Sequence, residues 1–265
     1  DGVLVELADG RTAAGDVLVA ADGSRSRVRD GYPTVPQPTD LGARTIFGRV
    51  PMNDAVQAAL GAELANRFSY VLGSEGCHLG LMPMAFRTPP RQAAAEIWPE
   101  IEMEERGDYY MCVLNMHPAA LDVPDEELFS LDGGQLWDVV RRRTRGWHPR
   151  LREVIDNAET AESFVLARRA TTSVRPWPVG PVLPLGDAVH TMPPSGGVGA
   201  NTALRDAARL LAGLTALAAG RLELAEVSCG YQETMLDYAT EALGMSLQIA
   251  QWSTPGPVVL SGAVA

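Results

Sequence analysis

Short apolar runs separated by turn residues occupy the first thirty positions, a pattern that predicts strands rather than helices. Residues 3–7 predict one strand, Asp9 and Gly10 supply turn chemistry, and residues 16–21 predict a second strand. The segment is therefore expected to form a hairpin. Because the second run is apolar throughout, we expect its strand to be buried on both faces.

The middle of the chain, from residue 44 to about residue 175, contains segments rich in aromatic and branched residues, which predict strands. It also contains amphipathic segments, which predict helices. Asn53 and Asp54 are typical of the first turn of a helix. Mostly sheet with helices packed on it predicts an α+β domain, in which Trp98, Trp137 and Trp177 are expected to be packing residues. The expected strands cover 45–50, 68–72, 78–82, 94–104, 109–116 and 163–173, and the expected helices cover 53–66, 135–145 and 149–158.

The last third begins with an apolar run over 181–187 that predicts a strand. A loop rich in Pro and Gly follows, from residue 190 to residue 201. Residues 202–219 are almost all helix formers with Gly220 as a stop signal, and residues 222–251 predict one or two further helices.

Charge narrows the possible partners. The 265 residues include 22 basic and 33 acidic side chains, which gives a net charge of −11. This balance argues against nucleic acid and against an anionic membrane surface. All 22 basic residues are Arg. These 265 residues contain no Lys, so they cannot carry out chemistry that needs a Lys amine, such as Schiff-base formation.

The cysteines and histidines are dispersed. Cys77, Cys112 and Cys229 form no C-x-x-C pair, and the four His show no metal-ligand spacing, so we expect neither disulfides nor a metal site. A reducing cytoplasm is the simplest setting. No apolar run approaches the roughly 20 residues of a membrane span, and the sequence shows no signal peptide.

Residues 186–201 carry the most informative pattern. They predict a strand end with the carboxylate of Asp187, a stiff Pro-Pro turn, a Gly-rich bend and a helix N-terminus. Glycines allow a ligand to approach the backbone, and the helix N-terminus stabilises negative charge. The Rossmann fingerprint is not met, because Gly197 and Gly199 are followed by Thr202. On spacing alone, a ligand-binding loop and a structural turn are equally open.

Two segments together resemble the FAD-dependent aromatic hydroxylases, the group that includes p-hydroxybenzoate hydroxylase. Residues 16–29 are similar to one internal motif of that family, a strand followed by Ala-Asp-Gly and a closing Val28-Arg29. Arg25, Arg27 and Arg29 alternate on this loop, and solvated charge is expected there more than contact with phosphate. The second motif matches at Gly186, Asp187, Ala188, His190, Pro193, Pro194, Gly196, Gly199 and Asn201.

The resemblance implies a fold and a reaction. The fold class would be α/β, an incomplete Rossmann-like FAD-binding domain, with an α+β sheet-rich substrate domain and C-terminal helices. NAD(P)H would reduce FAD, and the reduced flavin would pass one oxygen of O2 to an aromatic or polyketide-like small molecule. The expected domains are a partial FAD-binding domain over 1–40 and 176–222, a substrate-binding sheet domain over 41–175 and a helical segment over 223–265.

The resemblance also assigns roles to residues. Asp187 would bind the ribityl chain, the backbone around Gly199, Ala200 and Asn201 would face the flavin pyrimidine, and Pro193 and Pro194 would line the crevice where oxygen is transferred. Asp22 and Gly23 would lie near the FAD pyrophosphate. The remaining expected cofactor-binding residues are Gly186, His190, Gly196, Gly197 and Val198.

The family's G-x-G-x-x-G turn does not occur in this sequence, which begins at Asp1. We therefore expect a carboxyl-terminal portion of a monooxygenase. Two alternatives stay open, namely a flavoenzyme of another reaction type, such as a halogenase or a reductase, and a non-catalytic remnant that does not retain FAD. The sequence leaves the oligomeric state and the choice between NADH and NADPH open.

Overall fold

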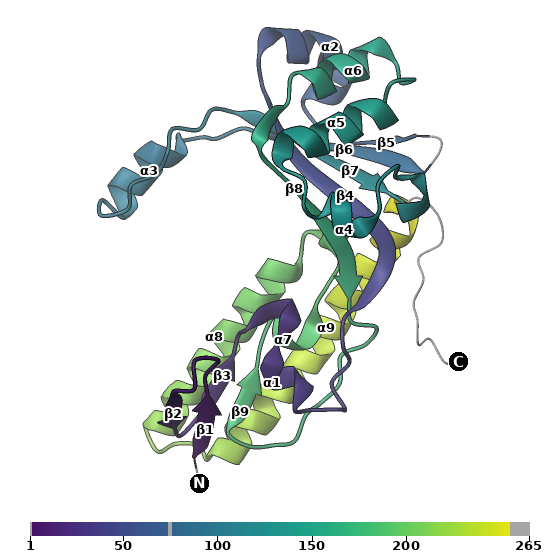
Figure 1. The fold of residues 1–265 in the computed structure, drawn as a ribbon. Helices are drawn as coiled ribbons and strands as arrows, with labels where there is room; N and C mark the ends of the chain where they lie inside the picture. The colour runs from purple at the N-terminus through teal and green to yellow at the C-terminus, as the bar shows by residue number, and fades with distance from the viewer. Residues whose placement is uncertain (1, 74–75, 255–265) are drawn as a thin grey trace. The chain divides into compact units, whose positions relative to one another are not determined.

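A computed structural model describes residues 2–73 and 76–254. The chain divides into two compact units (Figure 1). Unit 1 comprises residues up to 41 together with residues 168–253, and unit 2 comprises residues 42–167. Each unit has its own hydrophobic core. The assignment of an FAD-binding and a substrate-binding domain to particular residues stays a prediction.

Unit 1 contains two small sheets. Strands β1 (Val3–Glu6) and β2 (Thr12–Gly15) form an antiparallel hairpin, and β3 (Leu18–Ala20) pairs in parallel with β9 (Val182–Pro184). The predicted hairpin partner was wrong, because residues 12–15 pair with β1 and the apolar run beyond them pairs with a strand far along the chain. Burial on both faces was also wrong, since Val19 in this two-stranded sheet is 39% exposed.

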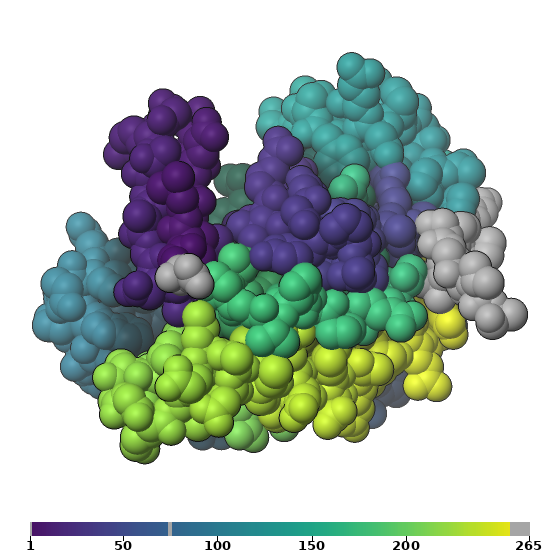
Figure 2. Space-filling model, turned by 90° about the horizontal axis from the view of Figure 1, so that it is seen from below, coloured from purple at the N-terminus to yellow at the C-terminus, as the bar shows by residue number. Residues whose placement is uncertain are grey.

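Long helices support these strands. Helix α8 (Gly199–Ala218) lies against α9 (Leu224–Ser253), and Figure 2 shows their lime and yellow residues along one face. Both regions were expected to be helical, and residues 222–251, predicted as one or two helices, form the single helix α9. The shorter helical segments of unit 1 are η1 (Gly23–Arg25), α1 (Arg27–Asp30), α7 (Asp187–His190) and η3 (Pro194–Gly196).

Unit 2 is built on a five-stranded sheet in the order β5-β6-β7-β4-β8. Strand β4 pairs antiparallel with β7, β7 with β6, and β6 with β5. These strands fall where their aromatic and branched residues predicted them, although β4 and β8 begin earlier than expected. Their bounds are Thr39–Pro51 for β4, Ser69–Leu72 for β5, Cys77–Met84 for β6, Tyr109–Met116 for β7 and Glu159–Ala170 for β8.

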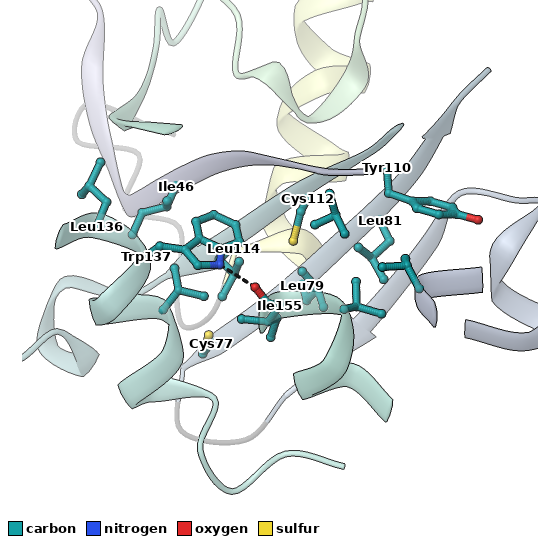
Figure 3. Packing of buried hydrophobic residues seen from close by; sticks show 14 of the residues in the cluster. Ile46, Cys77, Leu79, Leu81, Tyr110, Cys112, Leu114, Leu136, Trp137 and Ile155 are labelled. Carbon is teal, nitrogen blue, oxygen red and sulfur yellow. Dashed lines mark hydrogen bonds between the residues drawn. The ribbon is translucent and has the colours of Figure 1, made fainter. Parts of the chain in front are cut away.

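One face of this sheet carries α2 (Asp54–Ala65), α5 (Gly133–Arg143) and α6 (Pro149–Asp156) (Figure 1). Figure 3 shows the core between sheet and helices, where the indole N–H of Trp137 donates to the carbonyl of Ile155 at 2.7 Å. The predicted cap is confirmed, because the Asn53 side chain accepts a hydrogen bond from the Val56 N–H. Two short segments, η2 (Pro118–Ala120) and α4 (Asp125–Leu128), complete the unit.

The expected strand over 94–104 was wrong. Residues 90–97 form helix α3 (Pro90–Ile97), which stands away from the sheet in Figure 1, and residues 98–108 form no strand. Proline is favoured in the first helical turn, and the alanines that follow Pro90 favour helix. Trp98 is also 57% exposed and is not a packing residue, whereas Trp137 and Trp177 are buried as expected.

Residues 2–73 and 76–254 include no helix long and apolar enough to cross a membrane. The same residues include no cluster of three or more His, Cys, Asp or Glu side chains placed to hold a metal ion.

Candidate cofactor-binding site

Parallel pairing of β3 with β9 brings the two sequence motifs together in unit 1. Each strand leads into its motif, and η1 contacts α7 just beyond the paired ends. Arg29 makes the direct connection, since its guanidinium donates to the carbonyl oxygens of Asp187 at 3.3 Å and Ala188 at 3.2 Å. It also donates to the Ser24 carbonyl at 2.6 Å. Two motifs more than 150 residues apart in sequence therefore form one local structure.

Arg29 corrects the expectation of solvated charge. It is 3% exposed, and burial lowers the pKa of its guanidinium, although the nearby Asp30, Asp22 and Asp187 charges oppose this shift. Arg27 and Arg25 are exposed, as expected. The alternating spacing of the three arginines gave no signal that the third would be turned inward.

The turn that presents Asp187 depends on glycine. Gly186 has a φ of +61°, a left-handed conformation that other residues rarely adopt. A Cβ atom on Gly186 would also lie 3.0 Å from the Cβ of Ala203 on α8. The turn therefore packs closely on the helix, and a larger residue would displace it.

Asp187 is an exposed residue directly after this turn. Among the described residues, no group is hydrogen-bonded to its carboxylate. Its backbone carbonyl accepts a hydrogen bond from the Thr191 hydroxyl at 2.7 Å. Partial burial raises the pKa of Asp187, although the charges of His190 and Arg29 oppose this shift. An acceptor is thus held at the surface with its lone pairs available.

Behind the turn lies a buried polar cluster around Asp206 of α8. The Asp206 carboxylate is fully buried and accepts hydrogen bonds from the Gly186 N–H at 2.8 Å and the Tyr238 hydroxyl at 2.5 Å. His190 Nε2 lies 2.7 Å from the same carboxylate. Burial, together with the hydrogen bond to Asp206, raises the pKa of Tyr238.

This cluster places His190 away from solvent, although the sequence grouped it with the cofactor-binding residues. Sequence reasoning assigned no role to Asp206 or Tyr238. The available signal was that Asp206 is the one acidic residue of the predicted helix over 202–219.

The Pro-Gly loop crosses from α7 to α8. Pro193 is buried and Pro194 is exposed at the start of η3. A Cβ on Gly196 would lie 2.5 Å from Ser246 Oγ, so η3 lies directly on α9, and Gly197 ends η3 with a φ of +63°. The loop is thus fixed by close backbone contact at one glycine and by left-handed geometry at the next.

Helix α8 begins at the end of this loop without a side-chain cap. Val198 occupies the cap position, and its side chain makes no capping hydrogen bond to the first turn. Ala200 and Asn201 are exposed, and Gly199 is half-buried. Backbone N–H groups at such a helix end favour an anion, both as hydrogen-bond donors and through the helix dipole.

Asp22 acts on its own turn. Its carboxylate accepts hydrogen bonds from the Arg27 N–H at 2.8 Å and the Val28 N–H at 3.4 Å. Burial raises the pKa of Asp22, but hydrogen bonds from Ser26, Val28 and Arg27 outweigh it and leave the pKa below its ordinary value. Gly23 follows with a φ of +78°. This pair shapes the loop that Arg29 joins to Asp187.

The residues present fit a ligand with hydroxyl groups and an electron-rich, partly anionic edge. Asp187 offers an exposed acceptor for hydroxyl protons, and the start of α8 offers uncapped N–H donors. Both features belong to unit 1, and the loop over 191–198 connects them directly in sequence.

Comparison with known proteins points in the same direction. A family model described as "FAD binding domain" matches residues 137–243 of this chain. The dual O-methyltransferase/FAD-dependent monooxygenase elcB of Phaeosphaeria nodorum is 29% identical over 269 residues, covering 94% of this chain and 28% of that protein. The aurachin C monooxygenase/isomerase of Stigmatella aurantiaca is 27% identical over 255 residues, covering 95% of this chain and 56% of that protein.

Solved structures share the fold. A protein from Photorhabdus luminescens assigned as an FAD containing monooxygenase is similar with a TM-score of 0.77 and 29% identity, covering 99% of this chain and 66% of that one. HpxO of Klebsiella pneumoniae, complexed with FAD and uric acid, is similar with a TM-score of 0.70 and 23% identity, covering 96% and 56%. This chain spans between about a quarter and two thirds of these proteins. In its matched domain, its sequence and its fold, the chain is similar to FAD-dependent monooxygenases.

Proposed function

We propose that this chain is part of an FAD-dependent monooxygenase that uses NAD(P)H and O2 to hydroxylate an aromatic or polyketide-like small molecule. The observation that carries the proposal is the exposed carboxylate of Asp187, separated by one loop from the uncapped N-terminus of α8. The similarity to FAD-dependent monooxygenases supports it.

Each motif residue has a proposed task at the cofactor. Asp187 accepts hydrogen bonds from hydroxyl groups of the ribityl chain, and its raised pKa reflects an acceptor partly shielded from water. The N–H groups of Gly199, Ala200 and Asn201 donate to the pyrimidine edge and stabilise the negative charge that develops there. When bound, FAD supplies the redox chemistry with NAD(P)H and O2.

The loop residues shape the site. Pro193 and Pro194 restrict the backbone on the substrate side of the cofactor, Gly196 packs the loop on α9, and Gly197 supplies its left-handed turn. Asp22 and Gly23 hold the neighbouring loop near the pyrophosphate. In this scheme His190 and Gly186 support the Asp187 turn through their contacts with Asp206.

Substrate recognition is proposed on the sheet of unit 2, on the face opposite its helices. Ile46, Leu114 and their alternate neighbours point into the core, so Thr45, Phe47 and Asn115 lie on the other face. A hydrogen-bonded row crosses this face, with the Thr45 hydroxyl donating to Asn115 Oδ1 at 2.8 Å and Asn115 Nδ2 donating to the Tyr70 hydroxyl at 2.9 Å.

Beside that row, the rings of Phe47 and Phe164 stack with centroids 5.1 Å apart and planes inclined by 13°. Phe164 is 53% exposed, so its ring offers an aromatic surface. The Thr45 and Asn115 side chains are fully buried and bonded to each other, so the Phe164 ring is the surface that we propose for a flat aromatic substrate.

The test is cofactor binding by the purified chain. FAD is titrated into the wild-type chain and into Asp187→Ala, with flavin fluorescence as the measure, and oxidation of NADH and NADPH is followed with FAD present. We expect Asp187→Ala to weaken FAD binding about tenfold or more, as for loss of a hydrogen bond to a charged group. Asp237→Ala, which removes an exposed carboxylate from α9, serves as the control and should bind FAD like the wild type.

Each other outcome has a definite meaning. Unchanged FAD affinity in Asp187→Ala would remove Asp187 from the site. Absence of FAD binding and of NAD(P)H oxidation by the wild-type chain would contradict the proposal for this chain and would favour a non-catalytic remnant.

A further inference from the structure

Asp206 is a carboxylate with no exposure to solvent. Removing a carboxylate from water costs several kcal/mol unless hydrogen bonds replace its hydration. The groups found on its two oxygens are the Gly186 N–H, the Tyr238 hydroxyl and His190 Nε2. An apolar residue would fill the same space without this cost, so the carboxylate requires an explanation other than packing.

The three partners come from two elements besides α8. Gly186 is the N-cap residue of α7, His190 ends α7, and Tyr238 lies in the middle of α9. Asp206 belongs to α8, and the guanidinium of its neighbour Arg205 covers the Tyr238 ring at 4.0 Å from the centroid. One side chain therefore joins three helices at a single point.

That point lies directly behind Asp187. The Gly186 N–H is on the residue before Asp187, and His190 is three residues after it in the same short helix. On the other side, Arg29 and Thr191 hold the Asp187 carbonyl. Hydrogen bonds thus fix the backbone of Asp187 from both sides, while its carboxylate stays at the surface.

We propose that Asp206 is a positioning residue that fixes the turn at Gly186 and thereby directs the Asp187 carboxylate toward the cofactor. This inference rests on the proposed function for the cofactor part only. The hydrogen bond from Gly186 to Asp206 involves no atom of FAD, so the position of the turn and the binding of FAD are tested separately.

The first measurement concerns the backbone and needs no cofactor. Amide hydrogen exchange is measured by NMR in the wild-type chain and in Asp206→Asn. We expect the Gly186 amide to exchange about tenfold faster in the variant, as for loss of a hydrogen bond to a charged acceptor. The Leu185 amide, which donates to the Ala20 carbonyl at 3.0 Å, is the internal reference and should change little.

The second measurement separates positioning from simple destabilisation. FAD affinity is determined for Asp206→Asn in the wild-type chain and in an Asp187→Ala background. If Asp206 acts through Asp187, it weakens binding about tenfold in the first case and has almost no further effect in the second. Equal losses in both backgrounds would overturn the proposal.

Matched tyrosine variants keep the test informative if Asp206→Asn fails to fold. Tyr238 and Tyr231 are both buried on α9, but the Tyr231 hydroxyl donates to the Pro184 carbonyl at 2.9 Å and not to Asp206. We expect Tyr238→Phe to speed exchange at Gly186, and Tyr231→Phe to leave Gly186 unchanged at a similar melting temperature. Equal behaviour of Gly186 in the two variants would contradict the inference.

The outcomes distinguish the positioning role of Asp206 from the proposed FAD-dependent function. Faster Gly186 exchange in a chain that binds no FAD would support the positioning of the turn and contradict the proposed function. Unchanged Gly186 exchange in both Asp206→Asn and Tyr238→Phe would overturn the positioning role whatever the FAD affinity.

Discussion

Gly48 in β4 shows how tightly unit 2 is packed at the level of single atoms. A Cβ at this position would lie 2.3 Å from the Trp137 ring and 3.2 Å from Ser163 Oγ. Trp137 cannot easily move aside, because it is fully buried and its N–H is bonded to the Ile155 carbonyl. The hydrogen at Gly48 is therefore required for the ring to lie against the sheet.

We predict that Gly48→Ala lowers the free energy of unfolding by about 1–3 kcal/mol, the usual cost of overpacking. Urea denaturation followed by tryptophan fluorescence measures the change. Gly107→Ala is the control, because a Cβ there would have no atom within 4 Å, and it should be close to neutral. Equal stability of the two variants would show that the core adapts to the extra methyl group.

Asp187 carries a conflict between stability and binding. Because burial raises the pKa of this carboxyl, its charged form is less favourable in the folded chain than in the unfolded chain. The folded state therefore loses stability as the pH rises through the unfolded pKa and beyond. Removing the charge should relieve this penalty, although the exposure of the residue keeps the effect small.

We predict that Asp187→Asn slightly raises the melting temperature of the cofactor-free chain at neutral pH and weakens FAD binding. The corresponding gain in the free energy of unfolding is expected to stay below about 1 kcal/mol. Wild-type FAD affinity should fall as the pH drops through the raised Asp187 pKa, and this fall should be absent in Asp187→Asn. Calorimetry and FAD titration between neutral and acidic pH provide the two measurements. Parallel pH profiles for both proteins would contradict the prediction.

At the scale of elements, helix α2 contains a break at Gly61. This residue has a φ of 65° and a ψ of 172°, a region that is almost exclusive to glycine. The interruption leaves the Ala59 carbonyl available, and Arg150 at the start of α6 donates to it at 2.6 Å. The break therefore forms part of the contact between the two helices.

We predict that Gly61→Ala lowers the free energy of unfolding by about 1–3 kcal/mol, because alanine is strained in this conformation. Its methyl group would also lie 2.6 Å from the Arg150 guanidinium. Gly244→Ala in the interior of α9 should have the opposite sign and stabilise by about 0.5–1 kcal/mol, since that position is unobstructed. Thermal unfolding monitored by circular dichroism compares the two variants.

Most elements of this chain could be predicted from local pattern, and the exceptions have physical causes. Aromatic and branched residues identified most strands of unit 2, and helix formers identified α8. Pairing was harder, because the apolar residues 16–21 match many strands equally well and their true partner, β9, is distant in sequence. The segment 94–104 was predicted as a strand on the same basis, but Pro90 and the alanines at 93–95 form a helix.

The candidate site likewise contains some residues that the sequence could identify and others that it could not. Asp187 and the start of α8 could be placed together because they follow a strand in one short segment. The inward turn of Arg29 and the cluster around Asp206 depend on which elements meet in space. Sequence spacing carries no information about such meetings, so these residues could be identified only from the folded chain.

At the scale of the molecule, the two units differ in how the sequence builds them. Apart from Thr254, the described residues of unit 2 form one stretch of chain with its own sheet, helices and core. The core of unit 1 combines Val35 and Leu41 from the beginning of the chain with residues of α8 and α9. Neither part of unit 1 can complete its core without the other.

We predict that residues 39–170, which include all of β4 and β8, fold when expressed alone, whereas residues 1–41 do not. Cooperative loss of near-ultraviolet circular dichroism on heating would support independent folding of 39–170. A non-cooperative transition would argue against it.

The parallel pair of β3 and β9 sets an order of events during synthesis. β3 leaves the ribosome first, and at roughly 5–20 residues per second its partner follows only after about ten to thirty seconds. Residues 42–167, which form nearly all of unit 2, are synthesised in that interval, and the neighbouring strands β4 and β8 bring Thr39 Oγ1 within 3.4 Å of the Ala170 carbonyl. Folding of unit 2 would thus shorten the loop between β3 and β9 before these strands meet, so slowing it would delay formation of the proposed cofactor site on newly made chains.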